Sequence, residues 1–196
     1  MWAQMDDASL IARFREGDQD AFRTLLERYR KPVYAYLARM TGDKSAAEDL
    51  FQELFMRFIR NISGYEERGK FTAWLFTSAS HLALDYLKKA KRTGFALSLD
   101  KSYGEEGRSL GESVKSSESG PEEVLLGAEL GERLEEAIGR LSFEQKQVFF
   151  MREYSGLTFA EIAAALNVPL GTALARMSRA TAKLRNELEK SDALLS

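Results

Sequence analysis

Apolar residues recur every three or four positions along most of the chain, and this spacing is typical of amphipathic α-helices. Asp6 or Asp7 can cap a first helix, and Asp18 a second, because short acidic side chains accept hydrogen bonds from the free N–H groups of a first turn. Pro32 lies inside the second segment and predicts a kink or a break there. The helices predicted in this half cover residues 8–16, 18–39, 44–61 and 71–91.

The C-terminal part shows the same period in shorter segments, with helices predicted over residues 122–140 and 143–154 and a pair of helices within 157–185. Ser142 and Gln145 have the spacing of a capping box, in which each side chain bonds a backbone N–H of the other residue. Thr158 and Glu161 repeat this spacing. Both pairs therefore indicate helix starts.

A tight turn joins the pair of helices within residues 157–185. Asn167 suits a left-handed helix end, and Pro169 cannot continue a hydrogen-bonded ladder. We expect the second helix to restart at Gly171, with Thr172 near its cap. The face predicted to be buried carries Ala173, Met177, Ala180 and Leu184, and the cations lying mostly off it are Arg176, Arg179, Lys183 and Arg185.

Two helices, a tight turn and clustered cations are a common way to place a helix in the major groove of DNA. The alternative is a pair of bundle helices whose basic face is simply solvated. The spacing and the clustered cations together favour DNA binding.

Residues 98–121 are rich in Ser, Gly and Glu and carry few large apolar side chains. Such a segment buries too little surface to offset the entropy of ordering it, which favours a flexible acidic linker over a loop packed within one domain. No alternating strand pattern is present in the sequence. We therefore expect an all-α protein with two helical domains, residues 1–94 and 122–196, joined by a linker over 95–121.

The composition limits which kinds of site and which cellular location we expect for this chain. The chain has 196 residues, a formal net charge of -2, no cysteine and one histidine, so any nucleic-acid surface must be local and disulfides are excluded. We expect no metal site and no cofactor. The N-terminus is acidic without a signal-type apolar core, and no apolar run is long enough to span a membrane. A cytoplasmic protein is the expectation.

Residues 71–92 combine aromatic side chains such as Trp74 and Tyr86 with a terminal basic cluster, Lys88, Lys89, Lys91 and Arg92. Aromatic faces stack on unpaired bases and cations hold the neighbouring phosphates, so the segment suits single-stranded or melting DNA. The alternative is that the aromatics are core residues and that the cations only complement the helix dipole.

Acidic and amide side chains crowd residues 48–53, at Glu48, Asp49, Gln52 and Glu53. Paired carboxylates can do acid–base or metal chemistry, but no histidine or Gly-rich phosphate loop accompanies them. A solvated face or a protein-docking patch is the better interpretation. We expect neither an enzyme nor a small-molecule substrate.

Four motifs in order along the chain resemble those of bacterial sigma factors of the extracytoplasmic-function (ECF) group. They are Ala47-Glu-Asp-Leu-Phe-Gln-Glu-Leu-Phe, Phe71-Thr-Ala-Trp-Leu-Phe, Leu141-Ser-Phe-Glu-Gln-Lys-Gln-Val-Phe and Gly156-Leu-Thr-Phe-Ala-Glu-Ile-Ala. The resemblance covers nearly the whole chain and implies a region 2-like helical bundle, a region 4-like helix-turn-helix domain and sigma-factor activity.

The resemblance also implies partners and sites. The partners are promoter DNA, an anti-sigma factor and core RNA polymerase, bound through its flap and the clamp helices of its largest subunit. The polymerase-binding residues would be Asp49, Gln52 and Glu53, and the −10-binding residues Tyr65, Trp74, His81, Lys88, Lys89, Lys91 and Arg92. The −35-binding residues would be Pro169, Gly171, Thr172, Leu174, Ala175, Arg176, Arg179 and Lys183.

This sequence departs from the family pattern at its DNA-facing positions. The family usually has a cation and a serine where this chain has Leu174 and Ala175, and it has more polar or basic side chains at the positions of Thr77 and Ser80. These departures motivate one alternative, a sigma mimic that sequesters an anti-sigma factor without reading DNA. A separate alternative is a helix-turn-helix regulator that binds duplex DNA alone.

Overall fold

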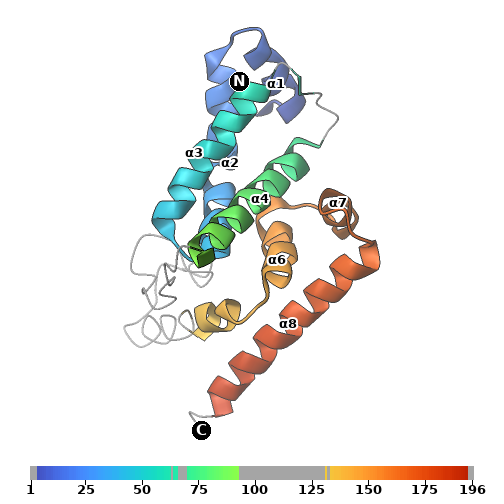
Figure 1. The fold of residues 1–196 in the computed structure, drawn as a ribbon. Helices are drawn as coiled ribbons and strands as arrows, with labels where there is room; N and C mark the ends of the chain where they lie inside the picture. Colours follow the sequence, from blue (N-terminus) through green and yellow to red (C-terminus); the bar gives the residue numbers. More distant parts are fainter. Residues whose placement is uncertain (1–3, 63, 66–69, 93–130, 132, 194–196) are drawn as a thin grey trace, which may run out of the picture. The chain divides into compact units, whose positions relative to one another are not determined.

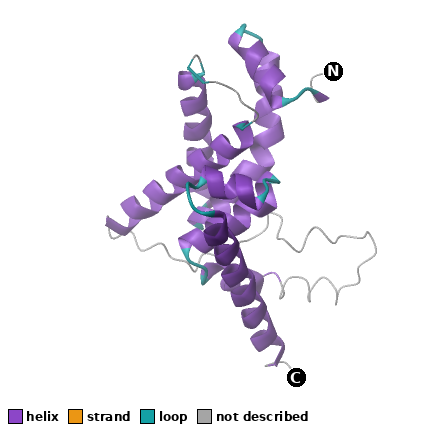
Figure 2. Ribbon diagram, turned by 90° about the vertical axis from the view of Figure 1, so that its right-hand side faces the viewer, coloured by secondary structure: helices purple, strands orange, loops and turns teal. Residues whose placement is uncertain are grey.

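The computed structural model describes residues 4–62, 64–65, 70–92, 131 and 133–193 (Figure 1). Within these residues every regular element is a helix, which confirms the all-α prediction (Figure 2). The labelled helices are α1 (Asp7–Arg15), α2 (Gln19–Thr41), α3 (Lys44–Asn61), α4 (Phe71–Arg92), α6 (Phe143–Ser155), α7 (Phe159–Ala165) and α8 (Leu170–Ala193). None of the described helices combines the length and apolar character needed to cross a membrane.

Acidic caps begin the first helices, as their spacing predicts. The carboxylate of Asp6 accepts from the backbone N–H of Ser9 at 2.8 Å, and the carboxylate of Asp18 caps α2 in the same way. Asp43, which is not among the caps predicted from the sequence, caps α3. Gly42 ends α2 with a positive φ of 70°, a conformation that glycine adopts without a steric penalty.

Helix α2 is the centre of the N-terminal helices, because it packs against α1, α3 and α4, while α3 also packs against α4. Most of the apolar stripe of α2 is buried, and its fully buried tyrosine, Tyr36, meets Phe76 of α4 edge to face at 5.3 Å. Burial of several such side chains, each worth roughly 1.5–3 kcal/mol, is what holds these four helices together.

Pro32 lies inside α2, which is continuous from Gln19 to Thr41, so of the predicted kink or break the break does not occur. A proline inside a helix costs about 3 kcal/mol through its missing N–H and its clash with the preceding turn. Tyr29 and Val33 on either side of it are buried. Their packing outweighs the local cost of the proline.

The C-terminal helices begin as predicted. The hydroxyl of Ser142 accepts from the backbone N–H of Gln145 at 3.3 Å, and the side chain of Gln145 accepts from the backbone N–H of Ser142 at 3.0 Å. Residues 133–139 are helical and agree with the second part of the helix predicted over 122–140. The rest of that helix and most of the predicted linker lie outside the described residues.

Candidate partner and nucleic-acid interfaces

Helix α3 has one buried and one exposed face. Leu54, Phe55 and Phe58 are buried. Asp49 and Gln52 are exposed, and Glu53 is half-buried with the Nε–H of Arg57 donating to its carboxylate at 2.7 Å. This hydrogen bond lowers the pKa of Glu53, so its carboxylate is charged at neutral pH. The three predicted polymerase-binding residues thus share one acidic, solvent-accessible stripe.

Met56, which is not among the residues predicted from the sequence, extends this stripe. Its side chain is 45% exposed, and it stands three residues after Glu53 and four after Gln52, on the same side of the helix. The signal that could have found it is its spacing from these polar residues. An apolar side chain beside carboxylates suits a protein partner better than a solvated face.

The predicted −10 residues Tyr65 and Trp74 belong to a cluster of aromatic rings. The ring of Trp74 stacks on Phe71 with centroids 6.0 Å apart, and the ring of Tyr65 lies edge-on to Trp74 at 5.5 Å. Phe58 of α3 contacts all three rings. Phe71 and Phe58 are buried, whereas Tyr65 and Trp74 are half-buried, so one part of each ring is core and another part reaches the surface.

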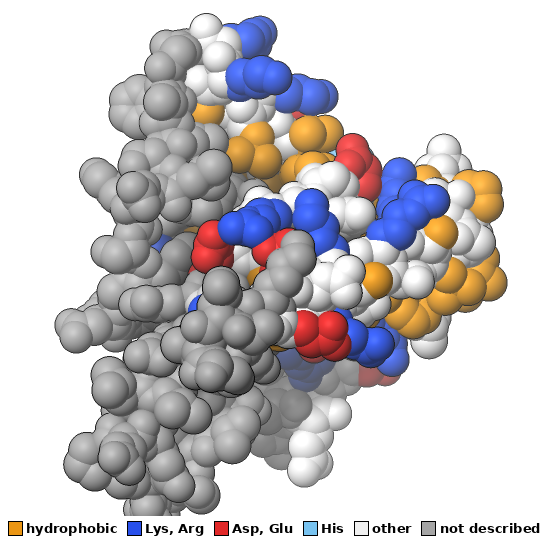
Figure 3. Space-filling view, turned by 90° about the horizontal axis from the view of Figure 1, so that it is seen from below, with side chains coloured by type: hydrophobic (Ala, Val, Ile, Leu, Met, Phe, Trp, Pro, Cys, Tyr) orange, Lys and Arg blue, Asp and Glu red, His pale blue; other side chains and the backbone are white. Residues whose placement is uncertain are grey.

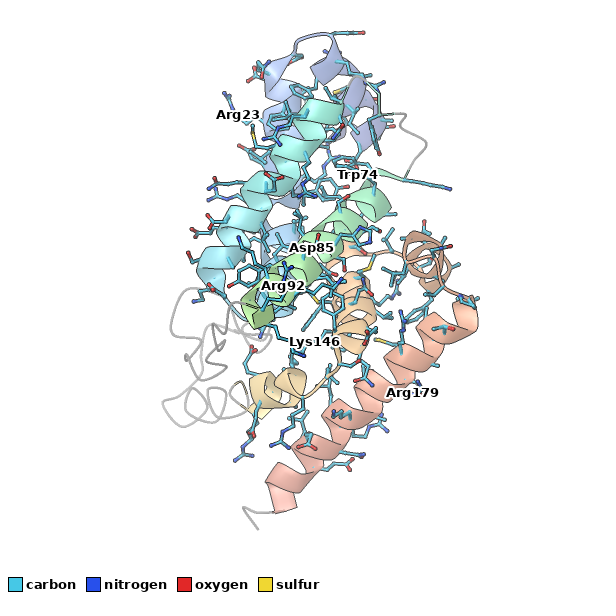
Figure 4. All side chains as sticks on the ribbon, in the orientation of Figure 1. Arg23, Trp74, Asp85, Arg92, Lys146 and Arg179 are labelled. Carbon is cyan, nitrogen blue, oxygen red and sulfur yellow. The ribbon has the colours of Figure 1, made fainter. Side chains whose placement is uncertain are left out.

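The remaining predicted −10 residues lie along α4, beyond the aromatic cluster. His81 is exposed in the middle of the helix. The cations Lys88, Lys89, Lys91 and Arg92 are exposed at its C-terminal end, and Figure 4 shows Trp74 near the start of α4 and Arg92 near its end. The helix therefore carries aromatic side chains at one end and a cluster of exposed positive charge at the other.

Ser80 is one of the positions in α4 at which this chain departs from the family pattern, and it does not lie on a DNA-facing surface. Ser80 is fully buried, and its hydroxyl forms a 2.6 Å hydrogen bond with the hydroxyl of Tyr36. The hydroxyl of Thr77 donates to the carbonyl of Ala73 at 2.7 Å. Interpreting Ser80 as a lost DNA contact is thus wrong, because a buried polar side chain serves the core.

The helix-turn-helix prediction is confirmed in its first helix and turn. The side chain of Thr158 and that of Glu161 form a complete capping box at the start of α7. Asn167 has a positive φ of 52°, as expected for a left-handed helix end. The second helix begins earlier than predicted: α8 starts at Leu170, and Thr172 donates its backbone N–H to the carbonyl of Pro169 at 2.9 Å. Thr172 therefore lies inside the first turn and is not its cap.

The buried and exposed faces of α8 follow the prediction, except that the predicted DNA-facing Lys183 is bonded within the protein. Ala173, Ala180 and Leu184 are buried and Met177 is half-buried. Arg179 and Arg185 are exposed and Arg176 is half-buried. The ammonium of Lys183 donates to the backbone carbonyl of Arg140, whose guanidinium also pairs with Glu136 and Glu187. Among the predicted −35 cations, Arg179 is thus the most accessible to DNA.

The N-terminal turns of α8 also present apolar side chains to solvent. Leu170 is 48% and Leu174 45% exposed, and Pro169 and Gly171 beside them are exposed as well. Leu174 is among the predicted −35 residues and Leu170 is not. The signal for Leu170 was its place directly after Pro169, one helical turn before Leu174.

Lys and Arg side chains gather in separate groups among acidic and apolar ones on the face shown in Figure 3. The whole chain has a formal net charge of -2. Any nucleic-acid surface on this near-neutral chain must therefore be local. Within the described residues no group of His, Asp and Glu side chains has the arrangement of a metal site.

Comparison with known families matches both halves of the chain. Residues 25–93 match the family model of sigma-70 region 2, and residues 131–184 match that of sigma-70 region 4. These ranges contain the acidic stripe of α3, the length of α4 and the helix-turn-helix of α7 and α8.

Similar proteins span the full length. The chain is 30% identical to the ECF RNA polymerase sigma factor SigW of Bacillus subtilis over 178 residues, covering 91% of this chain and 94% of the relative. It is also 30% identical to the ECF RNA polymerase sigma-E factor of Escherichia coli strain K12 over 191 residues, covering 96% and 97%.

Two solved structures share the fold. CnrH in complex with the cytosolic domain of CnrY aligns with a TM-score of 0.65 at 19% identity, covering 94% of this chain and 99% of that one. The sigma factor RpoE from Bartonella quintana, in complex with the anti-sigma factor NepR, aligns with a TM-score of 0.61 at 21% identity, covering 86% and 96%. Motif order, helical fold and full-length similarity agree, and the chain belongs to the ECF group of sigma-70 RNA polymerase sigma factors.

Proposed function

We propose that this sigma factor joins core RNA polymerase through the exposed stripe of α3 and then directs initiation at promoters read by α4 and α8. As a sigma factor it is an initiation factor and not an enzyme. The observation that carries the polymerase assignment is the pairing of exposed Asp49 and Gln52 with exposed Met56 on a helix whose opposite face is core. Charge supplies orientation in such an interface, and the apolar side chain supplies buried area.

The −10 function is assigned to α4 and its aromatic cluster. The accessible parts of Tyr65 and Trp74 offer surfaces on which unstacked bases can pack, and His81 offers a hydrogen-bonding group on the same helix. Lys88, Lys91 and their basic neighbours at the end of α4 would hold the phosphates. Melting is supported because bases leaving the duplex meet aromatic surface next to positive charge.

The −35 function is assigned to α8. Arg179 and, less directly, Arg176 would contact phosphates or bases, while Gly171 and Ala175 allow the helix to approach the groove closely. Lys183 receives a smaller role because its ammonium is already bonded to the carbonyl of Arg140. The proposed domains are residues 1–94 and 122–196, joined by a linker over 95–121.

An anti-sigma factor and a cytoplasmic location complete the proposal. RpoE, whose fold this chain shares, was solved with the anti-sigma factor NepR bound. A restraining partner of that class would explain how a constitutively folded initiation factor is kept inactive. The presence of such a partner is tested by purifying the tagged chain from unstressed cells. An inhibitory protein, and not polymerase, should copurify with the chain.

The polymerase assignment is tested with Asp49→Ala and Met56→Ala. Each should weaken binding to core polymerase by about tenfold, the effect of removing roughly 1.4 kcal/mol at an interface, while the thermal unfolding midpoint stays unchanged because both side chains are exposed. Fluorescence titration of labelled sigma factor with core enzyme measures the affinity. Glu27→Ala, an exposed carboxylate on α2, is the matched control and should bind normally.

The sigma mimic stays a second candidate because of Leu174 and Ala175, which cannot form the polar base contacts of the usual residues. Its other support has weakened, since Ser80 is a core residue. Crosslinking of the reconstituted holoenzyme to promoter DNA separates the two functions. Crosslinks from α4 and α8 support the initiation factor, and a holoenzyme that forms without any crosslink supports the mimic.

A further inference from the structure

Large apolar side chains that are well exposed are few in the described part of the chain. They are Met56, Leu170 and Leu174, and two of these three lie on the first turns of α8. Exposing about half of each of two leucines on one helix face is unfavourable, because apolar surface is stabilised roughly in proportion to the area removed from water. A pair at this place therefore points to a surface that another molecule covers.

The leucines stand on one side of a helix with three distinguishable stripes. Leu170 and Leu174 are one turn apart and share the first stripe. Arg176 and Arg179, three residues apart, begin a second stripe on the opposite flank. As far as Ala182, the outermost stripe between them holds small residues, Gly171, Ala175, Ser178 and Ala182.

This arrangement fits duplex DNA better than a protein groove. The small central residues let the helix backbone come close to the floor of the major groove, and the arginine flank is complementary to a phosphate strand. A protein partner would need acidic groups matched to Arg176 and Arg179 beside an apolar pocket. B-form DNA presents phosphates and apolar methyl groups together along the same groove.

The chemistry of leucine restricts what it can read. Its side chain neither donates nor accepts hydrogen bonds, so the edges of guanine, adenine and cytosine offer it nothing specific. The C5-methyl group of thymine is the apolar group of the major groove. Contact between this methyl group and a leucine removes both from water and discriminates thymine from cytosine at the same position.

We propose that Leu170 and Leu174 are specificity-determining residues that read thymine methyl groups in the −35 element, while Arg179 supplies sequence-independent phosphate contact. The inference rests on the proposed function of α8. It turns the departure from the polar family pattern at Leu174 into a change of preference, from hydrogen-bonded readout to apolar readout.

The test uses the holoenzyme of the full chain and a promoter identified by sequencing the transcripts that it starts in vitro. Each thymine of the −35 element is replaced in turn by deoxyuridine, which removes the methyl group and leaves the hydrogen-bonding edge unchanged. At one or more positions, promoter binding should fall about fourfold, the effect expected for losing one buried methyl-sized contact. Binding is measured by titrating holoenzyme against fluorescent promoter fragments.

Protein variants assign the effect to named side chains. Leu174→Ala should bind the thymine promoter more weakly and should no longer distinguish it from the deoxyuridine promoter at the position that Leu174 contacts. Leu170→Ala should do the same at a neighbouring position. Arg179→Ala is the matched control on α8: it should weaken binding to both promoters equally and keep their ratio. All three side chains are exposed, so the variants should fold normally.

The inference is overturned if deoxyuridine has no effect at any −35 thymine, or if its effect persists in both leucine variants. It is also overturned if the leucine variants transcribe normally and lose instead a protein that copurifies with the chain. These outcomes leave the proposed function standing, because the holoenzyme still initiates. A chain that starts transcription at no promoter contradicts the proposed function itself.

Discussion

The role assigned to the hydroxyl of Ser80 differs between the sequence and the structure. Next to His81 on a helix assigned to DNA, it reads as a polar surface residue. In the structure it is fully buried and bonded to the hydroxyl of Tyr36, whose pKa is raised by burial. The pair satisfies two polar groups inside an apolar core.

Ser80→Ala should therefore lower the free energy of unfolding by about 1–3 kcal/mol, because it leaves the buried hydroxyl of Tyr36 without this partner. Urea unfolding followed by circular dichroism measures the change. Ser78→Ala, half-buried on the same helix, corrects for the greater helix propensity of alanine. The double variant Tyr36→Phe with Ser80→Ala should be more stable than Ser80→Ala alone. If it is not, the hydrogen bond between the two side chains does not explain the loss.

At the scale of elements, helix ends were the most predictable feature. Ser142 with Gln145 and Thr158 with Glu161 form the capping boxes expected from their spacing, and α3 runs over the predicted residues 44–61. The two capping boxes depend on side chains three residues apart, which lie close in space regardless of how the rest of the chain folds. By contrast, α8 begins at Leu170, one residue before the predicted start at Gly171, and Thr172 lies within its first turn.

The capping box of α7 predicts a dependence of stability on pH. Hydrogen bonds from the side chain and backbone of Thr158 lower the pKa of Glu161 from its ordinary value of 4.5, so folding favours the charged form. The resulting stabilisation is fully present above pH 4.5 and is lost as the pH falls through the lowered pKa of the folded state. Glu161→Gln keeps a hydrogen-bonding side chain and removes the charge.

The thermal unfolding midpoint of the natural chain should thus exceed that of Glu161→Gln at neutral pH, and this difference should shrink toward zero as the pH falls below 4.5. Differential scanning fluorimetry from pH 7 to pH 3 follows both proteins. Glu153→Gln, an exposed carboxylate on α6 outside the cap, is the control. A difference that grows on acidification would contradict the assignment of the cap.

At the scale of the whole molecule, a near-neutral chain must bind a polyanion. Its formal net charge is -2, so we expect the attraction to DNA to come from the cations at the end of α4 and along α8. Each cation that neutralises a phosphate releases about one counterion on binding. Promoter affinity should accordingly decrease steeply with salt.

Lys91→Ala should reduce the slope of log affinity against log salt concentration by about 1, and by the same amount on promoters of different sequence, because a phosphate contact carries no sequence information. Holoenzyme binding to fluorescent promoter DNA between low and moderate salt measures the slope. Lys31→Ala, an exposed lysine on α2, should leave it unchanged. An equal reduction in both variants would mean that net charge, and not the end of α4, sets the salt dependence.

The sequence by itself determined the positions of the helices, most of their caps, the motif order and the family. These features rest on interactions between residues three or four apart and on the apolar period, which a chain carries before it folds. Residues of the acidic stripe such as Asp49 were found in the same way, because helical spacing alone places them on one side of α3.

The tertiary structure alone decided which distant segments the helices meet and which single positions depart from the local pattern. It kept α2 continuous through Pro32, buried Ser80 against Tyr36 at a separation of 44 residues, and bonded Lys183 to Arg140 at a separation of 43. It also left Leu170 and Leu174 exposed. Burial and long-range partners depend on segments that are distant along the chain, and local spacing contains no information about which distant segment will be there.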